Sequence, residues 1–386
     1  MGTKKFTIIW SSVLAVLLVL IIGATWAMNF FALSMDIFLG RGKQVVTVPE
    51  NVSAWDTDYY TELYADGDEL MALSQEAALT LAEEGEVLFK NNGVLPLAQG
   101  AEVTPFGYRY VVPVYGGSGS GNVNTESSRI VSAQSALNRY FTVNSTMENT
   151  LTHAHARGMG LDGYENPDEK GGFTGSTHKI IEYSPEVYTG TEASCAGTTG
   201  IVFIGRAGGE GRDLLANVEG SPLHGGAYFD GTPHQLALSE DEKDMIRFAK
   251  ANCDKIVVIL NTSNVMEISE LMADGGDLAA DAVLWIGSPG GMGLEAMAKI
   301  LCGEVNPSGK SVDLWMTDIM SDPVMSNFGN VEYDNLMMLP GGFPETVGEP
   351  TEMNFIEYEE NVYLGYRYYE TVSATGGSFS VFGQDG

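Results

Sequence analysis

The chain has 386 residues, 44% of them hydrophobic, so it can bury a core large enough for one or two domains. Its 51 acidic residues outnumber 20 basic residues and give a formal net charge of -31. This charge argues against nucleic acid and against an anionic membrane surface as partners, because phosphates are bound by Lys and Arg. It fits a protein that self-repulsion keeps soluble outside the cytoplasm.

The amino terminus predicts a single membrane-spanning helix. Residues 6–35 carry no charge and follow Lys4 and Lys5, which places the short tail 1–5 in the cytoplasm. This uncharged stretch is longer than the ~7–15 residues of the apolar region of a signal peptide, and it is long enough to span a bilayer, which needs ~20 apolar residues. A cleaved signal peptide is the alternative, but 25–27 is a poor cleavage site. We therefore expect a single-pass cell-membrane protein whose domain is extracytoplasmic.

The next segments are expected to be a polar connector and the first helix of a domain. Residues 36–73 are acidic and polar, with room for one short helix. A helix is expected from Ser74, as N-cap, to Gly93. A short strand over 103–106 follows.

From residue 201 onward, buried strands alternate with helices. Ser239 and Glu242 have the spacing of a capping box at the start of one of these helices. Apolar strands joined by helical crossovers predict an α/β fold with a mostly parallel sheet and helices on both faces. The expected elements are a strand at 201–205, a helix at 239–252, a strand at 255–260, a helix at 266–272, a strand at 282–286 and a helix at 293–302.

Glu210 is the candidate for chemistry. It follows the strand 201–205 and is bracketed by Gly208, Gly209 and Gly211, which allow a sharp turn and close approach of another surface. Open α/β folds place ligands at the carboxyl ends of their strands. A tight turn with a solvated carboxylate is the alternative.

A second glycine-rich loop, 116–121, follows the strand 103–106. Its GGSGSG sequence invites a phosphate-binding interpretation, but no Walker Lys-Ser/Thr follows and the spacing differs from a dinucleotide fingerprint. The remaining interpretations are a flexible turn or a loop whose backbone contacts a polar ligand.

Neither a metal nor another cofactor is expected. His153 and His155 have no third ligand at zinc spacing. The three cysteines form no disulfide framework, and Cys253 and Cys302 are expected to be small buried hydrophobes.

Five segments occur along the chain in the order EGEVLFKNNGVLPL (84–97), GGSGSG (116–121), GRAGGEGRD (205–213), WIGSPGG with LCGEVNPSGK (285–310) and EENVYLGYRYYE (359–370). These five segments resemble, in the same order, the carboxy-terminal α/β-sandwich domain of family 3 glycoside hydrolases. Residues 311–329 also resemble the subgroup in which this sandwich precedes the TIM barrel. One departure is Gly291-Met292, where many members have Gln-Glu.

The resemblance implies a retaining, β-glucosidase-like hydrolase that acts on a β-linked glucoside or oligosaccharide. Glu210 corresponds to the general acid/base of this family, whereas the nucleophile is an Asp on a TIM barrel that we do not find in this chain. Arg206 and Asp213 would orient Glu210 or remain solvated loop charges. The residues expected to line the sugar-binding surface are Arg206, Gly209, Asp213, Gly117 and Ser118.

We expect the chain to have five parts. The parts are a tail at 1–5, an anchor at 6–35, a connector at 36–73, the sandwich at 74–335 and a tail at 336–386. We interpret the chain as a fragment, because it stops at Gly386 before the segment that usually leads to the next module, and we expect little activity from it alone.

Two other functions compete with this interpretation. One is a non-catalytic envelope protein that binds glycan or a partner. The other is a nucleotide-binding domain, which would need an acidic ribose partner after a glycine fingerprint, and we find none in place.

Overall fold

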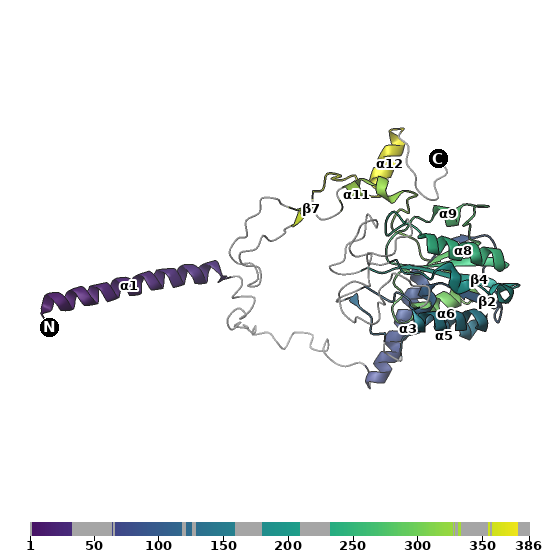
Figure 1. The fold of residues 1–386 in the computed structure, drawn as a ribbon, viewed down its shortest axis with the longest axis horizontal. Coiled ribbons are helices and arrows are strands. Elements are labelled where there is room, and N and C mark those ends of the chain that lie inside the picture. The colour runs from purple at the N-terminus through teal and green to yellow at the C-terminus, as the bar shows by residue number, and fades with distance from the viewer. Residues whose placement is uncertain are drawn as a thin grey trace, which may run out of the picture. The chain divides into compact units, whose positions relative to one another are not determined.

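A computed structural model gives the architecture, and its chain order is drawn in Figure 1. The chain divides into two compact units, Met1–Leu63 with Asn330–Phe355 and Tyr64–Gly329 with Ile356–Gly386. The structure describes residues 2–32, 64, 66–117, 121–125, 129–158, 180–208, 232–326, 328, 331–332, 354–355 and 357–376.

The first unit contains one long apolar helix, α1 (Thr3–Phe30), of 28 residues and mean hydropathy 2.6. None of its residues is buried. Its length and composition suit a membrane span, and a signal sequence near the amino terminus has the same properties. The same unit holds a two-stranded antiparallel ribbon of β7 (Val331–Glu332) and β8 (Asn354–Phe355).

The second unit is built on a six-stranded sheet in the order β1-β6-β5-β4-β2-β3. All pairs are parallel except β1 with β6, so the expected mostly parallel sheet is confirmed. The strands are β1 (Val87–Asn91), β2 (Glu102–Phe106), β3 (Thr142–Val143), β4 (Thr199–Arg206), β5 (Lys255–Thr262) and β6 (Ala282–Trp285).

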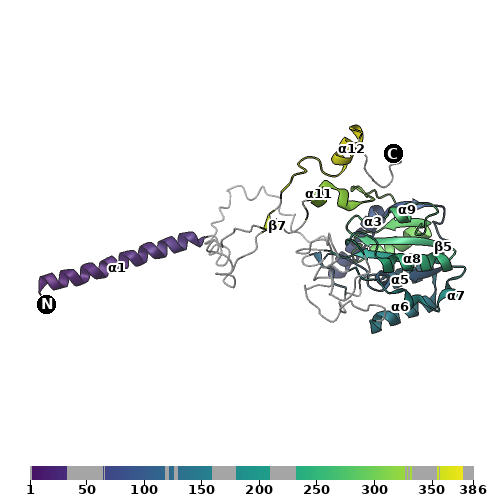
Figure 2. The same cartoon turned by 45° about the horizontal axis from the view of Figure 1, so that its top comes forward.

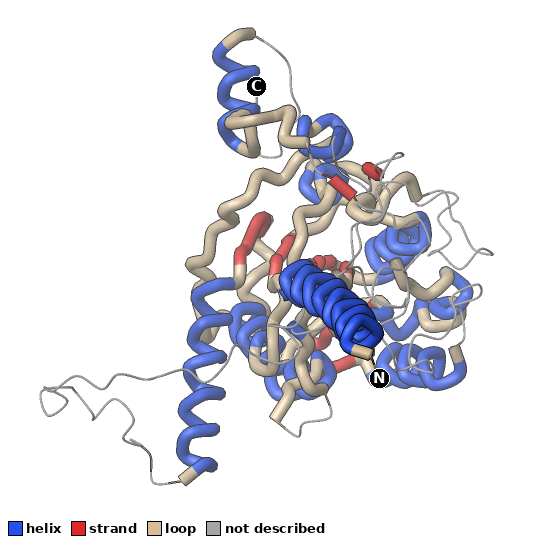
Figure 3. The backbone as a smooth tube through the Cα atoms, turned by 90° about the vertical axis from the view of Figure 1, so that its left-hand side faces the viewer, coloured by secondary structure: helices blue, strands red, loops and turns tan. Residues whose placement is uncertain are grey.

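Helices lie on both sides of this sheet (Figure 3), and α8 packs along β4 and β5 (Figure 2). One group consists of α3, α5 and α10, and the other contains α6, α7 and α8 with the turn η5 (Pro185–Tyr188). Helix bounds are α3 (Gly67–Gly85), α4 (Tyr108–Val111), α5 (Ala133–Tyr140), α6 (Ser145–Arg157), α7 (Glu192–Cys195), α8 (Glu240–Asn252), α9 (Ser269–Met272), α10 (Gly293–Cys302), α11 (Pro323–Ser326) and α12 (Tyr366–Ala374).

The core is centred on β4 and β5. Residues 201–204 and 257–260 are fully buried, because helices cover both faces of these central strands. The expected strands at 201–205, 255–260 and 282–286 and the helix at 293–302 are confirmed. The helix expected at 266–272 is shorter and begins at Ser269.

The expected helix from Ser74 to Gly93 is wrong at both ends. Helix α3 begins after Asp66, whose carboxylate accepts hydrogen bonds from the N–H groups of Asp68 (3.0 Å) and Glu69 (2.8 Å). It ends at Gly85, and 87–91 form strand β1 against β6. The branched and aromatic side chains of this segment suit a strand, and pairing with β6 outweighs the helical pattern that continues from α3.

Helix α12 contains the aromatic cluster near the carboxyl end of the chain. Tyr369 is buried and donates a hydrogen bond to Asp322 at 2.8 Å. This tyrosine therefore has a packing role. Tyr363 and Tyr366 are exposed.

Candidate functional site

The sheet topology identifies a candidate site at the carboxyl ends of β2 and β4. From β4 the chain continues to β5 on one side, whereas from β2 it continues to β3 on the other side. The strand order therefore reverses between β2 and β4, and open α/β sheets bind ligands at the carboxyl ends of such a pair. Residues 106–109 and 206–208 lie at this edge.

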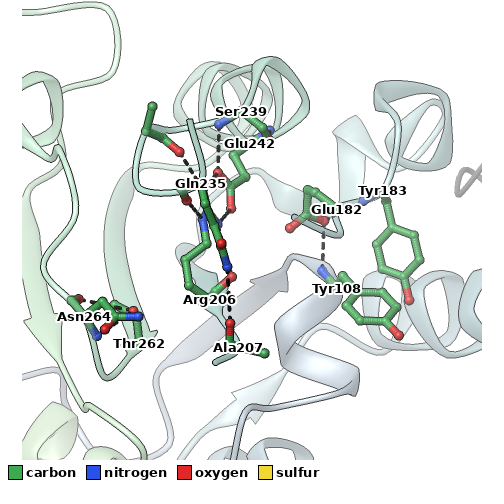
Figure 4. Close-up of polar contacts among 12 residues, drawn as sticks. Tyr108, Glu182, Tyr183, Arg206, Ala207, Gln235, Ser239, Glu242, Thr262 and Asn264 are labelled. Atoms are coloured by element: carbon green, nitrogen blue, oxygen red, sulfur yellow. Dashed lines mark hydrogen bonds and ion pairs between the residues drawn. The ribbon is translucent and has the colours of Figure 1, made fainter. Parts of the chain in front are cut away.

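Arg206, the last residue of β4, is completely buried and makes five hydrogen bonds (Figure 4). Its Nη1 and Nη2 donate to Glu242 Oε1 (2.5 Å) and Oε2 (2.7 Å) in a bidentate ion pair. The other donors reach the carbonyl oxygens of Gln235 (2.5 Å), Ala237 (2.6 Å) and Gly205 (3.0 Å). A guanidinium has five N–H donors, so none remains for a ligand in this arrangement.

Glu242 has two functions in this arrangement. It is the third residue of α8, and its Oε2 accepts the Ser239 N–H at 2.9 Å while Ser239 Oγ accepts the Glu242 N–H at 3.2 Å. The expected capping box is thus confirmed. The same carboxylate neutralises Arg206, so the start of α8 is joined to the end of β4 by a buried charge pair.

Further contacts join the segment after residue 231 to the end of β4. Gln235 Nε2 donates to the carbonyl oxygen of Ala207 at 3.3 Å. A Cβ on Gly208 would lie 3.8 Å from Asn264 Nδ2, so the residues after β5 lie next to this glycine. The chain on either side of 209–231 is consequently anchored to the same edge of the sheet.

A second buried carboxylate, Glu182, lies beside this arrangement (Figure 4). Its Oε1 accepts hydrogen bonds from the N–H groups of Tyr108 and Tyr183, both at 2.8 Å, and from the Tyr188 hydroxyl at 3.3 Å. Oε2 has no hydrogen-bond partner among the described residues. Burial raises the pKa of Glu182 to about 8, and the nearby Glu242 carboxylate also raises it.

Arg109 brings a second guanidinium to the same edge. It is 5% exposed, and its Cγ and Cδ lie against Gly205, where a Cβ would be 3.0 and 3.2 Å from them. Nη1 donates to the Val112 carbonyl oxygen at 3.4 Å, while Nε and Nη2 have no hydrogen-bond partner within the described part of the chain. Burial lowers the pKa of Arg109, and the positive charge of Arg206 also lowers it.

Asn261 fixes the start of the loop that contains GGSGSG. Its side-chain Oδ1 accepts the Val114 N–H at 2.7 Å, and its Nδ2 donates to the carbonyl oxygens of Val114 and Gly287, both at 2.9 Å. One amide near the end of β5 therefore joins the segments that follow β2 and β6. Gly116 is close-packed, since a Cβ there would lie 2.8 Å from the Gly121 carbonyl oxygen.

The predicted site residues divide into two groups. Arg206 and Gly117 are described, Arg206 buried and Gly117 half-buried. Four predicted residues lie outside the described residues: Gly209, Glu210, Asp213 and Ser118. Within the described ranges, no group of three or more His, Cys, Asp or Glu side chains could hold a metal ion.

Sequence reasoning missed Arg109, Glu182 and Asn261. Each is a polar or charged residue next to an apolar or aromatic run, and a polar residue in such a position requires a partner when buried. For Asn261, which directly follows the apolar residues 256–260, the sequence alone could have predicted a buried side chain that needs hydrogen-bond partners. The partners themselves are far away in sequence.

Comparison with known proteins agrees with the fold. The chain is 27% identical over 311 residues to β-glucosidase A of Butyrivibrio fibrisolvens, covering 78% of this chain and 32% of the relative. It is 26% identical over 302 residues to a β-glucosidase of Ruminococcus albus, covering 77% of this chain and 26% of the relative. The chain thus spans about a third or less of the length of these two relatives.

Solved structures give the same result. A β-glucosidase structure from Paenibacillus barengoltzii superimposes with a TM-score of 0.57 at 26% identity, covering 77% of this chain and 27% of that one. β-Glucosidase 3B from Thermotoga neapolitana superimposes with a TM-score of 0.56 at 23% identity, covering 80% and 37%. The family model described as the glycosyl hydrolase family 3 C-terminal domain matches residues 86–366, and the chain belongs to this family.

Proposed function

We propose that this chain supplies the general acid/base of a retaining β-glucosidase-like enzyme, with Glu210 as the carboxylic acid. Relatives named as β-glucosidases support a β-linked glucoside or oligosaccharide as substrate. The nucleophile is proposed to be a carboxylate of a TIM barrel joined to this domain.

The observation that carries the proposal is the buried contact between Arg206 and Glu242. Arg206 lies four positions before Glu210 in sequence, and its other partners, Gln235 and Ala237, follow the Glu210 segment. A catalytic group requires a rigid support that holds it near its working position. The contacts at this edge of the sheet supply such a support on both sides of the segment.

The chemistry requires two carboxyl groups about 5–5.5 Å apart, one acting as nucleophile and the other as acid and then base. The acid must hold its proton near neutral pH, which burial or a neighbouring negative charge can achieve. We propose that burial against the partner domain, or a nearby carboxylate, raises the pKa of Glu210 in this way.

Arg206 is proposed to position the Glu210 segment and not to bind sugar, since its donors are all used. Gly117 and Ser118, together with Gly209 and Asp213, are proposed to line the sugar-binding surface. The helix α1 is proposed to anchor the domain outside the cell membrane.

A non-catalytic function is the second candidate. Met292 is the N-cap of α10 and offers no side-chain cap, and Gly291 precedes it where many family members have Gln-Glu. A domain that has lost such polar groups could bind glycan or a partner without hydrolysing it.

The two candidates are separated by assaying the chain alone and the same chain joined to a family 3 barrel against aryl β-glucosides. If the chain supplies the acid/base of an enzyme, we expect negligible hydrolysis by the chain alone and clear turnover by the joined polypeptide. Absence of turnover in a joined polypeptide that is folded and binds glucose would favour the non-catalytic function.

A further inference from the structure

The segment that leads into helix α12 carries exposed apolar side chains. Five large side chains in and before the helix are between 48% and 73% exposed, and they are Tyr358, Val362, Tyr363, Leu364 and Tyr366. Monomeric soluble domains rarely expose large contiguous apolar patches, and such patches mark interaction sites. Tyrosine combines a rigid apolar ring with a polar hydroxyl, so exposed tyrosines suit a ligand that has both kinds of group.

A hollow of about 470 Å³ is lined by part of this segment and by one face of helix α12 (Figure 1). Val362 and Tyr363 line it from the segment before the helix. The helix and its C-cap contribute residues at helical spacing, and they are Arg367, Glu370, Thr371, Ala374 and Thr375. The volume lies within the ~300–1,000 Å³ of small-molecule sites, so the hollow can hold a small ligand.

The hollow has a fixed shape because contacts hold both of its sides. Arg367 Nη1 donates to the Val362 carbonyl oxygen at 3.3 Å, which joins the segment to the helix. Gly365, at φ +56°, forms the turn between them, and this conformation favours glycine. Tyr369 is buried on the opposite face of α12 and donates to Asp322 at 2.8 Å, which fixes the helix to the domain. A ligand therefore binds a surface that is already formed, and this lowers the entropic cost of binding.

The lining has the groups that bind a neutral sugar. A β-linked glucose ring has an apolar face of axial C–H groups, which packs against an aromatic ring such as that of Tyr363. The exposed Arg367 guanidinium can donate to sugar hydroxyls, and the exposed Glu370 carboxylate can accept from them. These two side chains have opposite charges, and the whole chain carries -31, so neither an anionic polymer nor a second copy of this chain is favoured. A neutral β-linked oligosaccharide therefore fits the hollow better than a charged ligand.

We propose that this hollow is an accessory binding site for a neutral β-linked gluco-oligosaccharide, with Tyr363 as the stacking ring and with Arg367 and Glu370 as hydrogen-bonding partners. The choice of glucose units rests on the proposed function of the domain, whereas the sugar-binding role rests on the lining of the hollow. None of the lining residues belongs to the candidate site at the carboxyl ends of β2 and β4. A second site on the same polypeptide raises the effective concentration of a long substrate.

The test titrates cellotetraose, a neutral β-linked glucose oligosaccharide, into the full 386-residue chain in detergent and measures binding by calorimetry. Wild type is expected to bind it. Tyr363→Ala should weaken binding about tenfold or more, the typical scale for truncating a central aromatic residue. Tyr363→Phe keeps the ring and should bind within about threefold of wild type. The control is Tyr358→Ala, which removes an exposed ring that does not line the hollow and should leave the affinity unchanged.

A variant on the polar side of the hollow gives a second readout. Glu370→Ala should weaken binding roughly fivefold or more, because hydrogen bonds to a charged group are stronger than neutral ones. The substituted side chains are all exposed, so the variants should unfold at the wild-type temperature. No detectable binding by wild type, or unchanged affinity in Tyr363→Ala or Glu370→Ala, would overturn the proposal. So would a Tyr358→Ala variant that loses as much affinity as Tyr363→Ala.

Failure of the accessory site can be told apart from failure of the proposed function. Tyr363→Ala in the chain joined to a family 3 barrel should leave hydrolysis of a short aryl β-glucoside unchanged, because that substrate needs only the catalytic site. Turnover by the joined polypeptide, with no binding of cellotetraose by the chain alone, would reject the accessory site and leave the acid/base proposal intact. Binding through Tyr363 without turnover would support the accessory site and reject the acid/base proposal.

Discussion

Arg206 and Glu242 form a bidentate ion pair that is closed to solvent, with Nη1–Oε1 and Nη2–Oε2 distances of 2.5 and 2.7 Å. The pair joins the end of β4 to the first turn of α8. Since Glu242 also accepts the Ser239 N–H, one carboxylate both caps a helix and balances a buried charge. The segment that contains Glu210 lies between these two elements in sequence.

Replacing only one residue of this ion pair should destabilise the domain strongly. Glu242→Gln leaves a buried guanidinium without its counter-charge, and we expect the free energy of unfolding to fall by about 3–5 kcal/mol in urea titrations. Arg206→Met with Glu242→Leu removes both charges and should recover part of that loss. The matched control is Lys243→Ala, which breaks the more exposed 2.8 Å pair with Glu240 on the same helix and should cost less than about 1 kcal/mol. Equal effects of the two single variants would contradict the role assigned to Arg206.

Glu182 should make stability depend on pH. Its folded pKa is about 8, whereas an unfolded Glu titrates near about 4.3. Between these values the folded protein keeps a proton that the unfolded chain has lost, so its free energy of unfolding falls as pH rises. The fall is about 1.4 kcal/mol per pH unit and levels off above the folded pKa.

The measurement compares wild type with Glu182→Gln at several pH values between about 5 and 9. The variant should unfold with a similar free energy at the acidic end and with a larger one at the alkaline end. Other buried acids, such as Glu86, are present in both proteins and cancel in the difference. The control is Glu186→Gln, an exposed neighbour whose pKa is lowered by the Ser184 hydroxyl. Parallel pH profiles for wild type and Glu182→Gln would disprove the assignment.

Gly107 should resist substitution because of both conformation and space. It has φ +101°, which L residues rarely adopt, and a Cβ there would collide with the carbonyl oxygen of Phe203. Gly107→Ala is expected to lower the free energy of unfolding by at least about 1–3 kcal/mol. The control is Gly85→Ala, at the end of α3, where no atom lies within 4 Å and stability should be unchanged or slightly raised. A neutral Gly107→Ala would show that the turn after β2 is not constrained.

Helix α1 should hold the protein in membranes. Its 28 residues extend about 42 Å, enough to cross a hydrocarbon core of about 30 Å. We expect the protein to remain with membranes after an alkaline carbonate wash and to become soluble when 1–35 are removed. Mass measurement of the mature amino terminus distinguishes an anchor from a signal peptide. An intact amino terminus is expected, and cleavage after the apolar run would identify a signal peptide instead.

Much of the sheet could be predicted from sequence. The strands β4, β5 and β6 are short apolar runs that the parallel sheet buries on both faces, and the α8 start carries a capping box whose spacing is local. Local signals failed for α3 and β1. The end of α3 at Gly85 depends on pairing of β1 with β6, which lies far along the chain.

The sequence predicts where the candidate site lies but not the contacts that form it. The glycine-rich segment indicates a site at the end of β4, whereas Gln235, Ala237 and Glu242, which bind Arg206, follow it by about thirty residues and are brought to it only by the fold. Likewise, Arg109 lies against Gly205 of β4, and Glu182 accepts the Tyr108 N–H from a segment more than seventy residues along the chain. The sequence also predicts that Arg206 contacts sugar, because no local sequence signal shows that its guanidinium is buried at the end of β4.

The central claim is tested most directly by Glu210→Gln in the chain joined to a family 3 barrel. Hydrolysis of a β-glucoside with a poor leaving group should fall by about 10²–10⁴-fold, because the departing oxygen no longer receives a proton. A substrate with an activated leaving group should be affected less, and azide should restore turnover. Glu240→Gln, an exposed acid on α8, should leave rates unchanged. Wild-type rates for Glu210→Gln on the poor leaving group would contradict the account.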